Sequence, residues 1–270
     1  MIRYLTGVAL LVLLVVAIVP AVPARAQEPE DRLPDLDQLV PTDLQVKRLH
    51  FGKRVAFRLG FSSAAANVGV GPLTLHGQRA DRAQTTMAVN QIVQQTMGAT
   101  RLVRDVGLMS FVVHPDHDHW HLLGFEKYEL RRAGSKTPFP RRDRKTGFCL
   151  GDRFTLPNAA KLPAFSATPL QADMCGLGRP DLLSLFTGIS VGWGDRYEAH
   201  IEGQYIDVTG LRSGRYELVH RVNTEGRLAE LDYTNNASSV LFSLKWHDDP
   251  RRTPAVRVLR SCPSSETCVR

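Results

Sequence analysis

The chain has 270 residues, with 34 Lys and Arg against 27 Asp and Glu and a formal net charge of +7. Loss of the two arginines of an N-terminal export signal would lower that charge to +5. So modest a charge disfavours nucleic acid as a partner, and basic clusters such as residues 141–145 are typical of solvated faces.

The first 26 residues have the three parts of an export signal. Arg3 supplies a short positive region, residues 7–19 form an almost unbroken apolar run, and residues 24–26 (ARA) give the small-x-small pattern of a cleavage site. The apolar run is shorter than the roughly 20 residues that a membrane-spanning helix needs. We therefore expect a signal peptide over residues 1–26 and no stable membrane insertion after its cleavage. The mature protein is expected to be secreted, either extracellular or in the cell envelope.

The remaining chain is long enough for one large domain with short extensions. Residues 27–42 are acidic and carry prolines, which is typical of an extended lead-in. Residues 43–247 are predicted to form the domain, and residues 248–270 a C-terminal tail.

Within the predicted domain, apolar residues recur with a period of two rather than 3.6. Turn residues separate these segments at residues 67–73, 212–214 and 232–236. Short alternating strands punctuated by Gly, Asn and Pro favour an all-β fold, with an antiparallel β-sandwich core. The candidate strands are residues 55–61, 85–96, 125–131, 205–208, 216–222 and 239–246.

A long irregular region interrupts the strands at residues 137–185, where prolines recur and periodicity is weak. Such a stretch is usually functional or tied down by covalent bonds. The chain has four cysteines, an even number that predicts disulfides in an exported protein. Three pairings are open, and proximity along the chain favours Cys262 with Cys268, which leaves Cys149 with Cys175. The second bond would pin the irregular region, and the first would close a local loop in the tail.

Four of the nine histidines lie between residues 114 and 121. In a strand, His117, His119 and His121 point from one face at intervals of about 7 Å, whereas a helix would scatter them. Imidazoles without a thiolate suit Cu(II), Zn(II) or Ni(II). His114 lies close enough to add a fourth nitrogen or to support the other three.

Two alternatives compete with a three-histidine metal site. A polar face with incidental histidines is one, but histidine is a common metal ligand and three at strict alternation favour a site. The other is a cupin-like oxygenase, whose first motif His119, His121 and Glu126 imitate. Glu126 has the wrong parity for an unbroken strand, and no later PxGxxH segment supplies the remaining histidine.

The segment HPDHDHWH at 114–121, followed by Phe125 and the Tyr-Glu-Leu of residues 128–130, resembles the copper-binding segment of the lysyl oxidase family. The resemblance extends over roughly residues 109–246. This chain departs from the family in having fewer cysteines around the site than the animal enzymes, in having Lys127 where the family has a histidine, and in the length and sequence of the loop between Cys149 and Gly188. Further similar segments follow in the family's order at residues 145–150, 188–197, 204–209, 214–216 and 232–236.

The resemblance implies a copper-dependent amine oxidase. By position in the motifs, His117, His119 and His121 correspond to the copper ligands. Lys145 and Tyr197 correspond to the residues that form the family's covalent cofactor, a lysine tyrosylquinone. The implied reaction converts primary amines, peptidyl lysine among them, to aldehydes with O2 as oxidant and releases H2O2 and ammonia. Asp195, two residues before Tyr197, is a candidate general base, although a surface aspartate would look the same.

Two other functions stay open at this point. One is a non-catalytic, secreted β-sandwich that binds copper or zinc, and the other is a cell-envelope interaction module with a structural metal. The distance between Lys145 and Tyr197 separates them from the oxidase, because only a cofactor requires the two side chains to meet beside the histidines.

Overall fold

The computed structural model describes residues 28–114, 117–140, 145, 147–170, 173–249 and 252–268. The predicted signal peptide lies outside these residues, as does most of the basic cluster at 141–145. The helical segments in these ranges are three short 3-10 turns, η1 (Thr96–Gly98), η2 (Ala159–Lys161) and η3 (Asp173–Cys175). Among the described residues, no helix is long and apolar enough to cross a membrane. The strands are β1 (Asp31–Arg32), β2 (Leu36–Gln38), β3 (Thr42–Phe51), β4 (Arg54–Asn67), β5 (Leu73–Gln78), β6 (Thr86–Gln95), β7 (Thr100–His114), β8 (His117–Leu123), β9 (Glu126–Arg132), β10 (Gly147–Phe148), β11 (Phe154–Thr155), β12 (Ser184–Ile189), β13 (Trp193–Tyr197), β14 (Tyr205–Asp207), β15 (Gly214–Val222), β16 (Ala237–Lys245) and β17 (Ala255–Cys262).

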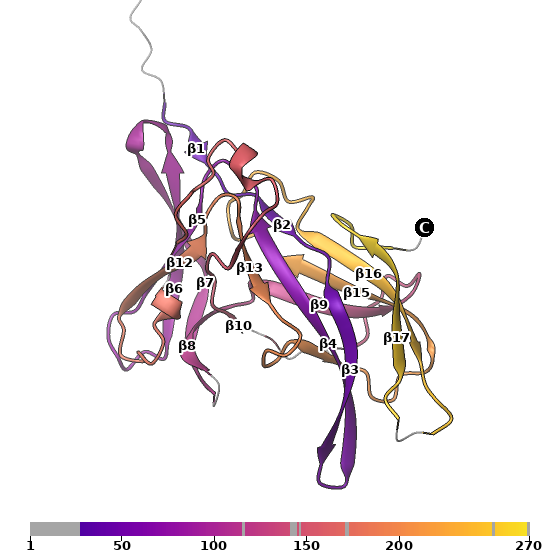
Figure 1. Ribbon diagram of the computed structural model, residues 1–270. Coiled ribbons are helices and arrows are strands. Elements are labelled where there is room, and N and C mark those ends of the chain that lie inside the picture. The colour runs from indigo at the N-terminus through magenta and orange to yellow at the C-terminus, as the bar shows by residue number, and fades with distance from the viewer. Residues whose placement is uncertain are drawn as a thin grey trace, which may run out of the picture.

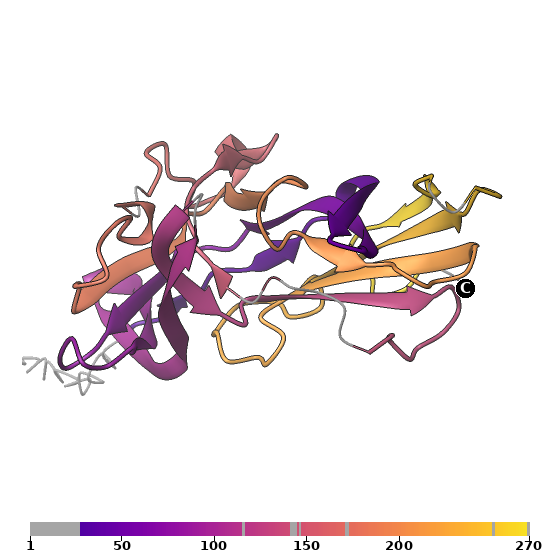
Figure 2. The ribbon, with the colours of Figure 1, turned by 90° about the horizontal axis from the view of Figure 1, so that it is seen from below.

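These strands form three antiparallel sheets. One has the order β10-β8-β7-β6-β5-β12, with β1 on β6; another has β17-β16-β15-β9. The third is centred on β4, which pairs with β2, β3, β13 and β14. Figure 1 and Figure 2 both show β4 running between the other two sheets. The prediction of an all-β, antiparallel fold is confirmed.

The central position of β4 follows from its sequence. Its first residues are exposed or half-buried, whereas residues 57 and 59–67 are buried. The second half has small side chains at Ser62, Ser63 and Ala64 to Ala66, and β2 and β13 pair with it there along opposite edges. Around it lies one apolar core, in which Phe61, Trp120, Phe148, Tyr216 and Phe242 are the largest enclosed aromatic side chains.

The predicted lead-in and tail are both part of the sheets. β1 and β2 lie within residues 27–42 and pair with β6 and β4. Within residues 248–270, β17 pairs with β16 along its length. The Cys262–Cys268 and Cys149–Cys175 disulfides are both present, and no described cysteine is free.

The irregular region also has the predicted character. Between residues 137 and 183 it contains only the two-residue strands β10 and β11 and the turns η2 and η3 among its described residues. The Cys149–Cys175 bond joins the end of β10 to η3, across 26 residues of sequence. β10 in turn pairs with β8, so the bond ties the irregular region to the histidine strand.

Candidate metal and cofactor site

The three alternating histidines lie on β8, a strand paired on both sides. β7 pairs along one edge, with Val112 opposite His119, and β10 along the other, with Phe148 opposite Leu122. Trp120 points into the core from the opposite face and donates a hydrogen bond from Nε1 to the Arg179 carbonyl (3.0 Å). Burial of that face fixes which face carries the histidines, because the side-chain period of a strand is two.

His117, His119 and His121, hereafter the histidine cluster, converge on one point. One nitrogen from each ring lies within 4.8 Å of the others, and the rings are closer than a flat strand would place them. The Nε2 atoms of His119 and His121 face each other at 2.8 Å. Nitrogen ligands at about 2 Å from one ion lie roughly 3 Å apart, so this spacing fits a metal ion held between them.

The protonation of the cluster also fits a metal. Burial lowers the pKa of His121 to about 3 and that of His119 to about 4, with the neighbouring histidines and Lys145 adding to the effect. Both rings are therefore neutral at pH 7, with lone pairs available to a cation. The Nδ1 atom of His119 is buried and makes no hydrogen bond to the described residues.

His114 lies beside the cluster rather than in it. Its ring centroid is 5.2 Å from that of His117, and its Nε2 is 3.3 Å from Glu202 Oε1. His114, His117 and Glu202 form a second group whose ligand atoms lie within 4.8 Å of one another. Glu202 is in the connection after β13 and carries no motif, so its approach to the histidines had no signal in the sequence.

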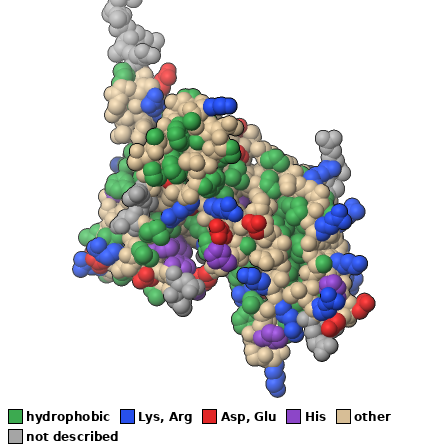
Figure 3. Space-filling view, viewed as in Figure 1, with side chains coloured by type: hydrophobic (Ala, Val, Ile, Leu, Met, Phe, Trp, Pro, Cys, Tyr) green, Lys and Arg blue, Asp and Glu red, His purple; other side chains and the backbone are tan. Residues whose placement is uncertain are grey.

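Lys145 and Tyr197 meet beside the cluster. The Nζ atom of Lys145 lies 4.5 Å from the centroid of the Tyr197 ring, although 52 residues separate the two in sequence. Both side chains are buried, and both line a cleft of about 650 Å³ together with the histidine cluster. In the space-filling view of Figure 3, histidine side chains gather near the recess between two lobes, with charged side chains around them.

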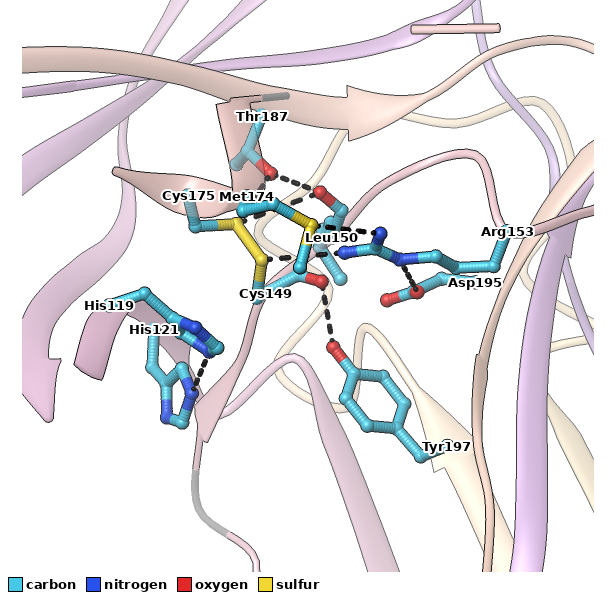
Figure 4. Close-up of a disulfide and its surroundings, with 10 residues drawn as sticks. All are labelled: His119, His121, Cys149, Leu150, Arg153, Met174, Cys175, Thr187, Asp195 and Tyr197. Carbon is cyan, nitrogen blue, oxygen red and sulfur yellow. Dashed lines mark hydrogen bonds and ion pairs between the residues drawn. A yellow bond between two sulfur atoms is a disulfide. The ribbon is translucent and has the colours of Figure 1, made fainter. Parts of the chain in front are cut away.

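The Cys149–Cys175 disulfide positions the tyrosine. Tyr197 donates a hydrogen bond from its hydroxyl to the Cys149 carbonyl (2.9 Å). Figure 4 shows the hydroxyl end of the Tyr197 ring pointing at this carbonyl. Its ring packs edge-on against Phe148, with centroids 5.2 Å apart. Burial raises the pKa of Tyr197 well above its usual value, and the charge of Asp195 raises it further.

Asp195 is enclosed on the same strand as Tyr197. Neither carboxylate oxygen makes a hydrogen bond to the described residues, and the nearest cation is Arg153, whose Nε is 3.7 Å from Oδ1 (Figure 4). Burial, followed by the charge of Glu126, raises the pKa of Asp195 to about 8. The group is therefore mostly protonated at pH 7. Arg153 was missed from the sequence because it looks like an ordinary loop arginine.

Glu126, considered above as a cupin-type ligand, is outside the cluster. β8 ends at Leu123, a turn at Gly124 follows, and Glu126 begins β9 in a different sheet. Its carboxylate accepts hydrogen bonds from His220 and Tyr128. The cupin ligand set is not assembled.

The fold and site define a class: an antiparallel β protein with a cluster of three histidines beside a buried lysine–tyrosine pair. A sequence model of the family described as lysyl oxidase matches residues 85–250, which is more than half of the chain. The chain therefore belongs to the lysyl oxidase family, a family of oxidoreductases.

Named relatives agree with this assignment. Human lysyl oxidase homolog 3 is 31% identical over 133 residues, which are 48% of this chain and 15% of that protein. Human lysyl oxidase homolog 1 is 31% identical over 124 residues, which are 46% of this chain and 18% of that protein. Human protein-lysine 6-oxidase is 31% identical over 127 residues, which are 46% of this chain and 25% of that protein. The aligned region thus spans a quarter or less of each of these relatives.

Proposed function

We propose that this protein is an exported, copper-dependent amine oxidase. It converts primary amines, with the lysine side chains of peptides as candidate substrates, to aldehydes, and O2 is reduced to H2O2 as ammonia is released. The observation that carries the proposal is the 4.5 Å approach of Lys145 Nζ to the Tyr197 ring beside the histidine cluster. Nothing in a metal-binding protein without catalysis requires these two side chains to meet.

The metal ligands in this proposal are the three histidines of the cluster, with copper as the ion. A lysine tyrosylquinone formed from Lys145 and Tyr197 would supply the electron-accepting group, which no ordinary side chain provides. The two side chains fit that group, because Lys145 Nζ already lies over the Tyr197 ring and both side chains are buried against Phe148 at the wall of the cleft.

The residues around the pair supply placement and proton transfer. Burial lowers the pKa of Lys145, against the opposing charges of Glu126, Asp195 and Glu202, so more of its nitrogen carries a free lone pair than in water. Asp195 holds a proton at pH 7, and as a candidate acid–base group it can give that proton to the Tyr197 side of the cleft. Glu202 is half exposed at the cleft and favours an approaching cationic amine over a neutral one.

The test uses mature protein loaded with copper in the presence of O2. We expect a positive quinone stain, a visible absorbance band and peroxide release from primary amines. Tyr197→Phe should abolish all three, whereas Tyr205→Phe, at a half-buried tyrosine outside the cleft, should keep them. A peptide map should show the segments bearing Lys145 and Tyr197 joined. Copper binding without stain, peroxide or joined peptides would instead support a non-catalytic copper- or zinc-binding protein.

A further inference from the structure

Glu126 is a buried carboxylate to which the proposed mechanism gives no task. Its side chain is fully enclosed at the start of β9. The Oε2 atom accepts hydrogen bonds from His220 Nε2 (2.8 Å) and from the Tyr128 hydroxyl (2.8 Å). The Oε1 atom is buried and has no hydrogen-bond partner among the described residues. A buried carboxylate with one unsatisfied oxygen is unfavourable unless a positive group lies nearby to compensate for its lost solvation.

The orientation of this carboxylate is fixed from two other strands. Gln38 on β2 donates from Nε2 to the Ala64 carbonyl (2.6 Å) and to His220 Nδ1 (2.7 Å). Because His220 Nδ1 accepts that bond, the ring hydrogen is on Nε2, which donates to Glu126. Two donors, His220 Nε2 and the Tyr128 hydroxyl, thus converge on the Oε2 atom of Glu126. The chain from Gln38 through His220 therefore holds Glu126 in a single position.

The cation available to Glu126 is Lys145. Both residues line a second cavity of about 790 Å³. Among the described residues, Lys145 alone lines both this cavity and the histidine cleft. Three carboxylates oppose the fall in the pKa of Lys145, and Glu126 has the largest effect, ahead of Asp195 and Glu202.

The two other carboxylates are poorer counter-charges. The raised pKa of Asp195, about 8, leaves it mostly uncharged at neutral pH. Glu202 has a side chain that is 47% exposed, so water screens its charge. Glu126 alone combines full burial with a fixed position.

We propose that Glu126 is a positioning residue, the counter-charge that keeps the Lys145 side chain inside the fold and at the face of the Tyr197 ring. A lysine stem is flexible and its ammonium gains much from solvation, so burial without a partner is strongly unfavourable. With a buried carboxylate lining the same cavity, the buried position of the lysine side chain competes with an outward one. The consequence for cofactor formation rests on the function proposed above.

The direct test is a double-mutant cycle on metal-free protein, with Glu126→Gln, Lys145→Met and the double variant. We expect Glu126→Gln to lower the melting temperature when Lys145 is present. In the Lys145→Met background the same change should raise the melting temperature or leave it unchanged, because it removes a buried carboxylate that has lost its counter-charge. Glu217→Gln, at a buried carboxylate that accepts from the Cys268 backbone, should have one effect in both backgrounds.

An equal effect of Glu126→Gln in both backgrounds would overturn the proposal. If Glu126→Gln alone does not fold, the proposal requires the double variant to fold, since both charges are then gone. A double variant that also fails to fold would contradict it.

Amine-reactive labelling gives a second, site-resolved measurement. In the wild type, Lys145 should react far more slowly than Lys127, whose side chain is 57% exposed. Glu126→Gln should speed the labelling of Lys145 at least tenfold relative to Lys127, and Glu126→Asp, which keeps the charge, should restore part of the protection. Unchanged protection in Glu126→Gln would count against the counter-charge.

Copper loading then links the pair to the cofactor. Glu126→Gln should bind copper as the wild type does but yield fewer joined Lys145 and Tyr197 peptides, and wild-type yield in that variant would contradict the positioning role. If the wild type itself gives no joined peptides, the proposed oxidase function fails. The cycle and the labelling would still decide the role of Glu126.

Discussion

Replacement of Asp195 by asparagine should remove the loss of stability that this residue causes as the pH rises through the neutral range. Above pH 3.8 the unfolded chain ionises this carboxyl, while the folded protein holds the proton until about pH 8. Folding must therefore take up a proton across this window, and the free energy of unfolding falls as the pH rises. The contribution is fully present below pH 3.8 and is lost by the time the pH has passed 8. Asparagine has the same shape and cannot ionise.

The magnitude follows from the shift. At about 1.4 kcal/mol per pKa unit, the part of the window between pH 6 and pH 8 corresponds to roughly 3 kcal/mol. Asp195→Asn should thus gain about 3 kcal/mol over the wild type between pH 6 and pH 9. Burial of the group means that solvent screening reduces this figure little.

Urea unfolding of metal-free protein, followed by tryptophan fluorescence at pH 6, 7, 8 and 9, measures the difference. Asp181→Asn is the matched control, because the Asp181 side chain is 43% exposed and its hydrogen bond with Arg179 lowers its pKa. Its difference from the wild type should be constant over this range. A difference for Asp195→Asn that also stays constant, within about 1 kcal/mol, would show that Asp195 is already ionised at pH 6 and would refute the reasoning.

Three further outcomes are expected. Copper should stay bound down to about pH 5, because two rings of the histidine cluster, His119 and His121, have pKa values of about 4 and about 3. Dialysis followed by metal analysis measures this, and release near pH 6.5 would contradict it. Cys149→Ser should cost about 3–4 kcal/mol in urea unfolding and Cys262→Ser about 2, since the first closes the longer loop; the opposite order would count against loop entropy as the cause. Gly147→Ala should weaken copper binding, measured by chelator competition, because a Cβ there would lie 2.6 Å from His121 Cβ. Gly151→Ala, whose Cβ would meet only ordinary contacts, should bind copper as the wild type does.

Much of the fold could be predicted from the sequence because the alternation is strong where one face of a strand is buried. Residues 239–246 alternate clearly, and in β16 the side chains of Val240, Phe242 and Leu244 are buried while those of Leu241 and Ser243 are half-buried. Residues 216–222 also alternate in sequence, although β15, which lies beside β16, is buried on both faces. The strand β7 gave no such signal, because most of its first nine residues are exposed and several are charged. β17 was assigned to a tail for a related reason: it is an edge strand with few buried side chains.

Some of the candidate site could likewise be predicted from the sequence and some could not. That the three histidines share a face follows from a local pattern, because side chains alternate between the two faces of a strand. The meeting of Lys145 and Tyr197 depends on how β10 and β13 are joined through different sheets, which no spacing encodes. Family resemblance suggested that meeting. The parity argument removed Glu126 from the histidine cluster but gave no sign that β9 would bring it to the same cavity as Lys145.

The alternation of β8 also affects how the histidine cluster tolerates insertions and deletions. If β8 slipped by two residues against β7 and β10, a histidine would still occupy two of the three positions on the cleft side, and the aromatic and aliphatic side chains would still face the core. A slip by one residue would place Asp118, Trp120 and Leu122 in the cleft and three imidazoles in the apolar interior. Length changes of one residue in the turns that flank β8 should therefore be rare among working relatives, whereas changes of two should be found more often.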